Sequence, residues 1–269
     1  MNANRPPLVL LHGLTMSERA WADVVPLLAP HHHVIAPTLL GHRDGPKPTQ
    51  RPTRVSHLVD DIEALLDTLG LHQVHLAGNS LGGWIAIELA RRGRARSVCA
   101  LSPAGFWEPR RASQTHGTSI IAREAATARL GRPLAPLGLR SPLIRRLALR
   151  NIATRGDRIS SAQALDIVHD LTECPVTTDL LSTDEYIAPL PDLPCPMTVA
   201  WAEDDRLLPL AVNTPIARLR LPEQTHFRVL RGVGHVPMID DPELVARTIL
   251  ATTVGHPQPE DPQTQGFSH

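Results

Sequence analysis

One serine in this sequence is flanked by glycines, in the pattern Gly78-Asn79-Ser80-Leu81-Gly82 between an apolar run and a helix-like segment. Gly-x-Ser-x-Gly between a strand and a helix is typical of a nucleophile elbow, a sharp turn that exposes the serine hydroxyl. Such a turn leaves room only for small neighbours, which Gly78 and Gly82 provide. The start of the following helix places free backbone N–H groups behind the serine, where they favour negative charge. The pattern predicts Ser80 as a nucleophile.

A serine hydroxyl is a weak nucleophile until a base removes its proton, and that base needs an acid to orient it. The sequence contains both in the chain order Ser, Asp, His. Asp205 follows an apolar segment at 196–201, and His235 follows another at 227–230. Residues after the carboxyl ends of parallel strands share one edge of a sheet, where ligands bind. Ser80, Asp205 and His235 are therefore predicted to meet there as a catalytic triad.

A reaction at a carbonyl also needs hydrogen-bond donors for the developing oxyanion. Leu14 follows the first apolar segment, so its backbone N–H is predicted to reach the same edge as that of Leu81. These two groups are the predicted oxyanion hole. His12 is interpreted as a structural member of this turn more than as a proton carrier. The predicted substrate pocket is bordered by His12, Gly13, Trp107 and Met238.

These four motifs, in this order, resemble the α/β-hydrolase fold superfamily, in the branch that carries a helical cap. The similarity covers roughly 1–105 and 193–254. The resemblance implies the same triad and the same two oxyanion donors. It also implies that no metal and no cofactor takes part.

Two family patterns are matched with small departures. At the acid, the family has Gly-x-x-Asp-x-x-x-Pro, and here Ala202 replaces the glycine. Glu203 and Asp204 compete with Asp205 for the role, but the spacing to Pro209 selects Asp205. After the histidine, one acid is exchanged for another in the matching set His235, Pro237, Asp240 and Pro242.

The elements that must position these residues alternate between strand-like and helix-like segments, which predicts an α/β fold. The predicted sheet is mostly parallel, with about six strands flanked by helices. Strands are predicted at 7–11, 33–36, 74–77, 98–101, 196–201 and 227–230. Helices are predicted at 21–28, 55–69, 81–92, 211–219 and 242–253. The antiparallel strands with which the family commonly begins are missing, so the strand near Val34 becomes an edge that an N-terminal arm, a homodimer partner or His31–His33 is predicted to cover.

The alternation breaks near residue 106. Arginine-rich, helix-prone pieces follow at 120–130, 143–152 and 162–171, separated by prolines and without a clear strand. We therefore predict a hydrolase core at 1–106 and 193–255 with an inserted helical cap at 107–192. The polar, proline-rich end of the chain, 256–269, is predicted to be disordered.

The composition indicates which binding partners and which cellular compartment are favoured. The chain has 27 basic and 27 acidic residues, so its net charge does not favour nucleic acid or an anionic membrane as the main partner. No apolar run approaches the ~18 residues that span a bilayer, and no secretory signal is visible. Three cysteines without metal-ligand spacing, Cys99, Cys174 and Cys195, favour a reducing cytoplasm. Adjacent histidines at 31–33 point to opposite faces of a strand, which favours a solvated segment over a metal site.

The predicted function is cofactor-independent hydrolysis of a small-molecule carboxylic ester, or a related acyl substrate, through an acyl-enzyme. Carbon–carbon bond hydrolases, lactonases, thioesterases and perhydrolases use the same triad and stay open as alternatives. An alternative from a different class is a ligand receptor that has retained the triad without catalysis. The substrate is left to the cap, in which no motif identifies it.

Overall fold

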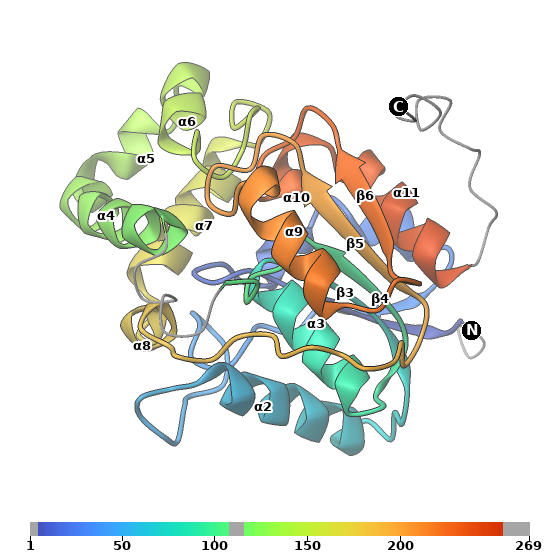
Figure 1. Ribbon diagram of the computed structural model, residues 1–269. Coiled ribbons are helices and arrows are strands. Elements are labelled where there is room, and N and C mark those ends of the chain that lie inside the picture. Colours follow the sequence, from blue (N-terminus) through green and yellow to red (C-terminus); the bar gives the residue numbers. More distant parts are fainter. Residues whose placement is uncertain (1–4, 108–115, 255–269) are drawn as a thin grey trace.

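The structure of the protein is a computed structural model that describes residues 5–107 and 116–254. The apolar runs of the sequence form its strands: β1 Pro7–Leu11, β2 His33–Ile35, β3 Val74–Asn79, β4 Ala95–Leu101, β5 Met197–Ala202 and β6 His226–Leu230. They form one sheet in the order β2-β1-β3-β4-β5-β6, and every neighbouring pair is parallel. The predicted parallel α/β sheet is confirmed (Figure 1).

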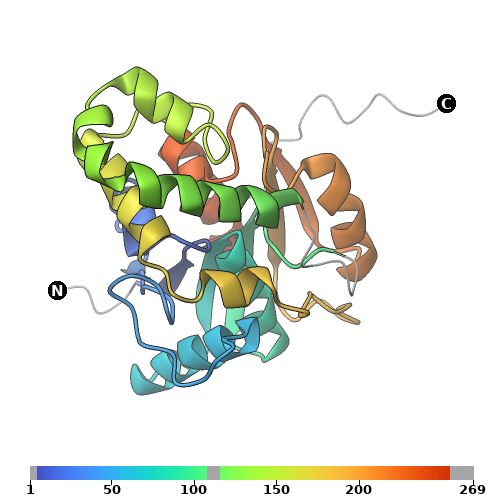
Figure 2. The same ribbon diagram turned by 90° about the vertical axis from the view of Figure 1, so that its left-hand side faces the viewer.

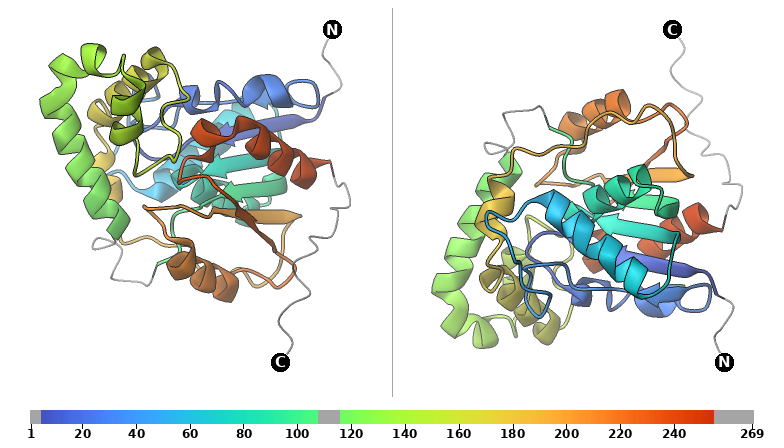
Figure 3. Two further views of the ribbon diagram at one scale, coloured as in Figure 1. Left: turned by 90° about the horizontal axis from the view of Figure 1, so that it is seen from above. Right: turned by 90° about the horizontal axis from the view of Figure 1, so that it is seen from below.

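Helices cover both faces of the sheet (Figures 1 and 3). One face carries α2 Val55–Thr68, α3 Leu81–Arg91 and α9 Leu210–Arg220, and the other carries η1 Glu18–Trp21, α1 Val25–Leu28, α10 Pro237–Asp240 and α11 Pro242–Thr253. Side chains of a strand alternate between faces. Accordingly Val9 and Leu11 join the hydrophobic core under α2 and α3, whereas Leu8 and Leu10 join the core that contains α11. The inner strands β1, β3, β4 and β5 are buried on both sides, which is why they are mostly apolar in sequence.

Local signals fix the ends of these helices. α2 ends where Gly70 adopts a left-handed backbone with φ of 68°, and the N–H of Leu71 then donates to the carbonyl of Leu66 at 2.8 Å. At the start of α11, the carboxylate of Asp241 accepts a hydrogen bond from the N–H of Leu244 at 2.8 Å. None of the helices in the described ranges is long and apolar enough to cross a membrane.

Between β4 and β5 the described residues form helices and no strand. These are α4 His116–Gly131, η3 Arg132–Leu134, α5 Ala135–Gly138, α6 Pro142–Ala148, α7 Ser161–Thr172 and α8 Thr177–Leu181. The group lies beyond the carboxyl ends of the strands, as the views in Figures 2 and 3 show. We keep the cap boundaries 107–192 as a proposal. Residues 108–115 and the tail at 256–269 lie outside the described residues.

The edge strand β2 differs in part from expectation. His33 is exposed, and Val34 and Ile35 are half-buried. His32, expected in a solvated segment, is buried instead, because its Nδ1 lies 3.2 Å from the carbonyl of Pro6 and its Nε2 lies 2.8 Å from Oγ1 of Thr253. This ring therefore fastens the start of β2 to α11. A homodimer that covers β2 stays a prediction.

Candidate active site

Ser80 occupies the turn between β3 and α3, where its backbone is strained. Its φ of 54° and ψ of −115° lie in a region that side-chain-bearing residues rarely adopt. Hydrogen bonds hold this conformation: the Ser80 N–H donates to the carbonyl of Leu101 at 2.9 Å, and its carbonyl accepts from the N–H of Trp84 at 3.1 Å and of Ala104 at 3.0 Å. Strain that the surroundings hold in this way is typical of functional positions.

Two glycines make the turn sterically feasible. A Cβ at Gly78 would lie 2.2 Å from the carbonyl oxygen of Gly82, and a Cβ at Gly82 would lie 2.1 Å from the carbonyl oxygen of Leu11. Both distances are far below van der Waals contact with backbone atoms that cannot move aside. The close approach of α3 to β1 and β3 therefore requires glycine on each side of Ser80.

Asp205 and His235 meet as the sequence predicts. Oδ2 of Asp205 accepts a hydrogen bond from Nδ1 of His235 at 2.7 Å, and both side chains are buried. Oδ1 of Asp205 accepts from the N–H groups of Leu207 and Leu208, at 3.0 and 2.7 Å. A carboxylate that receives Nδ1–H leaves Nε2 without a proton, which is the form that a general base needs.

Ser80 and His235 face the same space. Together they line two small cavities, of about 50 and 60 Å³. Their side chains are not hydrogen-bonded to each other in the described part of the chain; catalytic hydrogen bonds commonly tighten only when substrate binds. The side-chain amide of Asn79 also donates to the carbonyl of His235 at 2.8 Å, so the residue before the serine holds the loop of the histidine.

Asp240 ties the histidine loop to the helical segment above it. Its Oδ2 accepts from the N–H of Gly234 at 2.7 Å and of Thr154 at 3.0 Å, and its Oδ1 accepts from the N–H of Arg155 at 2.7 Å. The N–H of Val236 donates to the carbonyl of Ile152 at 2.8 Å. The acid that follows the histidine in the sequence is thus a buried clamp between two loops.

The two predicted oxyanion donors border the serine. Leu14 lines both small cavities with Ser80, and Leu81 is the first residue of α3 and lines one of them. The N–H of a first helical residue has no acceptor within its own helix. The turn before Leu14 is close to the nucleophile, because a Cβ on Gly13 would lie 3.3 Å from Cβ of Ser80. We keep the assignment of the two N–H groups as an oxyanion hole for the proposal below.

The predicted pocket residues divide into two pairs. Gly13 lines the smaller cavity and Trp107 the larger. Met238 does not belong there: it lies on α10, packed into the core on the face of the sheet that carries η1. His12 does not line either cavity, and is fully buried.

His12 instead holds the oxyanion turn. Its Nε2 accepts the N–H of Leu39 at 2.9 Å, so its proton is on Nδ1, which donates to the carbonyl of Gly13 at 2.8 Å. Burial lowers the pKa of His12 well below its usual value, with His42 adding to the effect. A neutral ring in this tautomer is a spacer between β1 and the loop after β2.

Buried neutral histidines predict a loss of stability in acid. Burial lowers the pKa of His42 to about 4, and its ring lies 4.9 Å from that of His12. Unfolding restores a pKa near 6.5, so the unfolded chain gains the proton first. The stabilisation is complete above pH 6.5 and is lost as the pH falls toward 4. Between pH 7.5 and 5.5 we expect His42 to contribute about 1 kcal/mol to the fall in unfolding free energy.

Urea titrations at the two pH values measure this effect. His42→Gln should show a smaller fall than the unsubstituted protein, and His33→Gln, which alters an exposed histidine of β2, is the matched control. Equal falls in all three proteins would contradict the prediction.

The structure adds side chains that the sequence did not single out. Ile121 and Glu124 from α4, and Leu207 from the loop of Asp205, line the cavities at Ser80. Oε1 of Glu124 accepts a hydrogen bond from the side-chain amide of Asn151 at 2.7 Å. A single acid in an alanine-rich helix was the only signal for Glu124 in the sequence.

Glu124 should cost stability at neutral pH. Burial raises the pKa of its carboxyl above the usual value, although Asn151 and two arginines oppose the shift. A raised folded pKa means that the charged form is disfavoured in the fold, so the cost is present above the unfolded pKa and vanishes below it. We expect Glu124→Gln to raise the unfolding free energy at pH 7.5 by about 0.5 kcal/mol, after solvent screening is allowed for. Urea denaturation at pH 7.5 and 4.0 tests this; a gain at pH 4.0 as large as that at pH 7.5 would contradict it.

The cysteines stand apart from the site. Cys99, Cys174 and Cys195 are free thiols, and burial raises the pKa of Cys99 to about 12 and that of Cys195 to about 11. Thiols of this kind are poor nucleophiles at neutral pH. Within 5–107 and 116–254, no group of three or more His, Cys, Asp or Glu residues is arranged to hold a metal ion.

The chain is similar to known proteins in sequence and in fold. The model of the "Alpha/beta hydrolase family" matches residues 8–248. Epoxide hydrolase EphH of Mycobacterium tuberculosis (strain ATCC 25618 / H37Rv) is 35% identical over 72% of this chain and 92% of its own length. Pimeloyl-[acyl-carrier protein] methyl ester esterase of Aromatoleum aromaticum (strain DSM 19018 / LMG 30748 / EbN1) is 30% identical over 89% of this chain and 95% of its own. The crystal structure of carboxylesterase CesB from Bacillus subtilis superposes with a TM-score of 0.71, at 19% identity, over 95% of this chain and 86% of that one.

Proposed function

This chain belongs to the alpha/beta hydrolase family, and we propose that it is a serine hydrolase that cleaves a carboxylic ester through Ser80, His235 and Asp205. The observation that carries the proposal is the 2.7 Å hydrogen bond from Nδ1 of His235 to the buried Asp205, beside a serine in a strained turn. That bond leaves Nε2 of the histidine free to accept the serine proton.

The acylation step follows from these positions. Oγ of Ser80 attacks the ester carbonyl carbon while Nε2 of His235 takes the hydroxyl proton. The carbonyl electrons move to its oxygen, and the N–H groups of Leu14 and Leu81 donate to that oxyanion. The intermediate then collapses, the bond to the alcohol oxygen breaks, and His235 gives its proton to the departing alcohol.

Deacylation repeats the sequence with water. His235 removes a proton from a water molecule, whose oxygen attacks the acyl carbon. The second tetrahedral intermediate expels Oγ of Ser80, which takes the proton back from His235, and the carboxylic acid leaves. Asp205 stays ionised throughout and stabilises the imidazolium that forms twice in each cycle.

Epoxide hydrolysis is a second candidate, because the relative with 35% identity carries that name. A serine that opens an epoxide forms an ether, and an ether has no carbonyl for water to attack. Covalent catalysis by Ser80 therefore ends at that stage with an epoxide, whereas it turns over with an ester. An epoxide would need water activated directly by His235.

One experiment separates these functions and the non-catalytic alternative. The protein is treated with a fluorophosphonate probe, and turnover is measured with a p-nitrophenyl ester, a lactone, a thioester and styrene oxide. We expect Ser80 to be labelled, and the ester to be hydrolysed over many turnovers in a reaction that the probe abolishes. Turnover of the epoxide alone, insensitive to the probe, would replace the ester proposal. Labelling without turnover of any substrate would support a receptor.

A further inference from the structure

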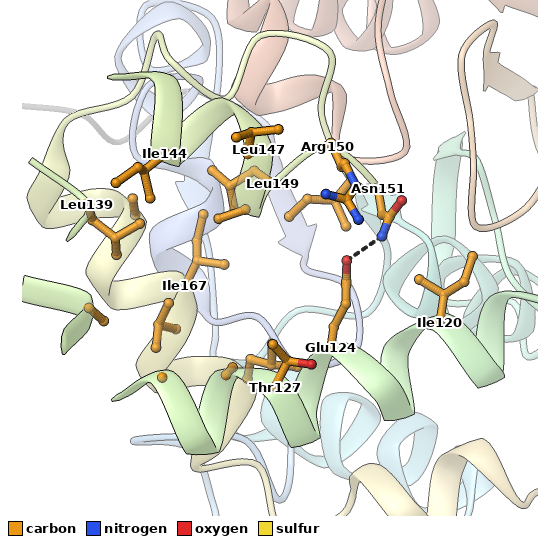
Figure 4. Close-up of a pocket in the computed structure, with 18 of the residues that line it drawn as sticks. Ile120, Glu124, Thr127, Leu139, Ile144, Leu147, Leu149, Arg150, Asn151 and Ile167 are labelled. Atoms are coloured by element: carbon orange, nitrogen blue, oxygen red, sulfur yellow. Dashed lines mark hydrogen bonds between the residues drawn. The ribbon is translucent and has the colours of Figure 1, made fainter. Parts of the chain in front are cut away.

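A large pocket, partly open to solvent, lies within the helical group. It has a volume of about 1110 Å³ and is bordered by α4, η3, α5, α6 and α7 (Figure 4). Small-molecule sites usually measure about 300–1,000 Å³, so this chamber is large for one. Apolar side chains at one end include Leu139, Ile144, Leu147, Leu149 and Ile167. Glu124, Arg150 and Asn151 gather at the other end (Figure 4).

The chamber adjoins the nucleophile. Four residues, Glu124, Ile152, Ile167 and Leu171, line both the chamber and the cavity of about 50 Å³ that contains Ser80 and His235. The hydrogen-bonded pair of Glu124 and Asn151 therefore stands at the boundary between them. A substrate whose carbonyl lies at Ser80 can extend past this polar pair into the apolar end.

A second cavity at Ser80 is also small. It measures about 60 Å³, close to the 50 Å³ of the first. Trp84, Trp107 and Leu180 form its walls, and the two tryptophan rings meet edge to face at 5.3 Å. Ser80 thus borders two small cavities of similar size, and only the first of them shares residues such as Glu124 and Ile152 with the chamber.

We propose that the substrate carries a long apolar chain on one side of its scissile ester bond, bound in the chamber. This inference rests on the proposed function and names the substrate class for it. The chain leaves water for the apolar end of the chamber, which favours binding by an amount that grows with each buried methylene.

Two series of esters test the proposal and its orientation. The first joins methanol to acids of four to sixteen carbons, and the second joins acetic acid to alcohols of the same lengths. We expect kcat/KM to rise at least tenfold from the shortest to the longest member of one series.

Matched substitutions on α4 connect this preference to the chamber. Ala128 lines it, and Ala126 lies two residues away on the exposed side of the same helix. Ala128→Trp should remove the rise with chain length, whereas Ala126→Trp should retain the rise. Equal rates along both series, or an unchanged rise in Ala128→Trp, would overturn the proposal. Probe labelling and turnover of the shortest ester show separately whether the catalytic proposal holds.

A different observation concerns the outer surface of the same helices. Three large apolar side chains of α4, α5 and α6 that do not line the chamber are exposed to solvent: Leu130 (86%), Leu137 (69%) and Leu143 (67%). We call these three residues the leucine face. Exposed apolar side chains that gather on one surface mark an interaction site more often than scattered ones do.

The segment that carries the leucine face has charges of one sign. Residues 125–156 contain seven arginines and no aspartate or glutamate, although the whole chain is balanced at 27 basic and 27 acidic residues. Six of these arginines are exposed, and Arg132 among them pairs with Glu173 of the loop after α7: Arg129, Arg132, Arg140, Arg146, Arg150 and Arg155. A second copy of the chain placed symmetrically on this face would bring like charges together, which disfavours a homodimer here. Apolar side chains among cations are the pattern of segments that bind anionic lipid surfaces.

We infer that the leucine face docks on an anionic lipid surface. Co-sedimentation with phosphatidylglycerol vesicles and with phosphatidylcholine vesicles tests it. Binding should be at least tenfold stronger to the anionic vesicles and should weaken as salt is added. The triple variant Leu130→Ser, Leu137→Ser, Leu143→Ser should lose at least tenfold, whereas Leu219→Ser, which removes an 83% exposed leucine of α9, should not.

Several outcomes would overturn this inference: no binding to either kind of vesicle, equal binding to both, or undiminished binding by the triple variant. Sedimentation velocity adds one more, because self-association that the triple substitution abolishes would assign the leucine face to a second copy of the chain.

Discussion

Ser80→Ala should lower kcat/KM for an activated aryl ester by at least ~10⁴-fold. The substitution removes the hydroxyl oxygen that we propose as the nucleophile, and alanine has no atom with which to form an acyl-enzyme. The remaining groups can still bind substrate and polarise its carbonyl, so a small residual rate above the uncatalysed reaction is expected. Initial rates with p-nitrophenyl butyrate measure the loss.

Controls separate lost chemistry from lost fold. Ser80→Ala removes the hydroxyl of a half-buried side chain and keeps the backbone hydrogen bonds of the turn. The thermal unfolding of the variant should therefore match that of the parent. Labelling by a fluorophosphonate should disappear with the activity. Ser182→Ala, at an exposed serine after α8, should keep both. Undiminished turnover by Ser80→Ala would remove the covalent mechanism and leave direct attack by water on the substrate.

Much of the fold follows from short-range features of the sequence. The inner strands are mostly apolar runs of five to seven residues, and Gly70 and Asp241 set helix ends through their own backbone and side-chain geometry. The end of an element is harder to predict where a contact with a distant segment of the chain determines it. A helix was expected over 143–152, but α6 ends at Ala148, and the carbonyl of Ile152 accepts instead from Val236 of the histidine loop. Nothing within the helical segment itself indicates that contact.

The triad and the pocket differ in predictability for a related reason. Ser80, Asp205 and His235 each follow a strand of a parallel sheet, and the topology alone brings such positions to one edge. The lining of the pocket depends on how the inserted helices pack over that edge. Met238 was therefore predicted to border the pocket although it packs in the core, and Glu124 was not predicted at all. The net charge did not indicate the basic segment at 125–156, because it sums the seven arginines of that segment with acidic segments elsewhere.

Asp205→Asn is expected to cost about 10³- to 10⁴-fold in kcat, although it changes one atom. The N–H groups of Leu207 and Leu208 both donate to Oδ1, so the asparagine must keep its carbonyl oxygen there. Its NH₂ group then points at Nδ1 of His235 and needs an acceptor. The proton of the imidazole therefore moves to Nε2. A protonated Nε2 faces Ser80 as a donor and can no longer act as the base.

The two acids next to Asp205 allow the experiment to test the position of the carboxylate as well as its charge. Asp204 and Glu203 are exposed, and the carboxylate of Glu203 accepts only from the N–H of Gly232 among the described residues, at 3.0 Å. Asp204→Asn and Glu203→Gln remove the same unit of negative charge within two residues of Asp205, and both should stay within about threefold of the parent, since exposed charges are screened by solvent. A loss confined to Asp205→Asn therefore requires the hydrogen bond to His235. A comparable loss in either neighbour would mean that the field of the acidic loop, and not the tautomer of the histidine, supports the reaction.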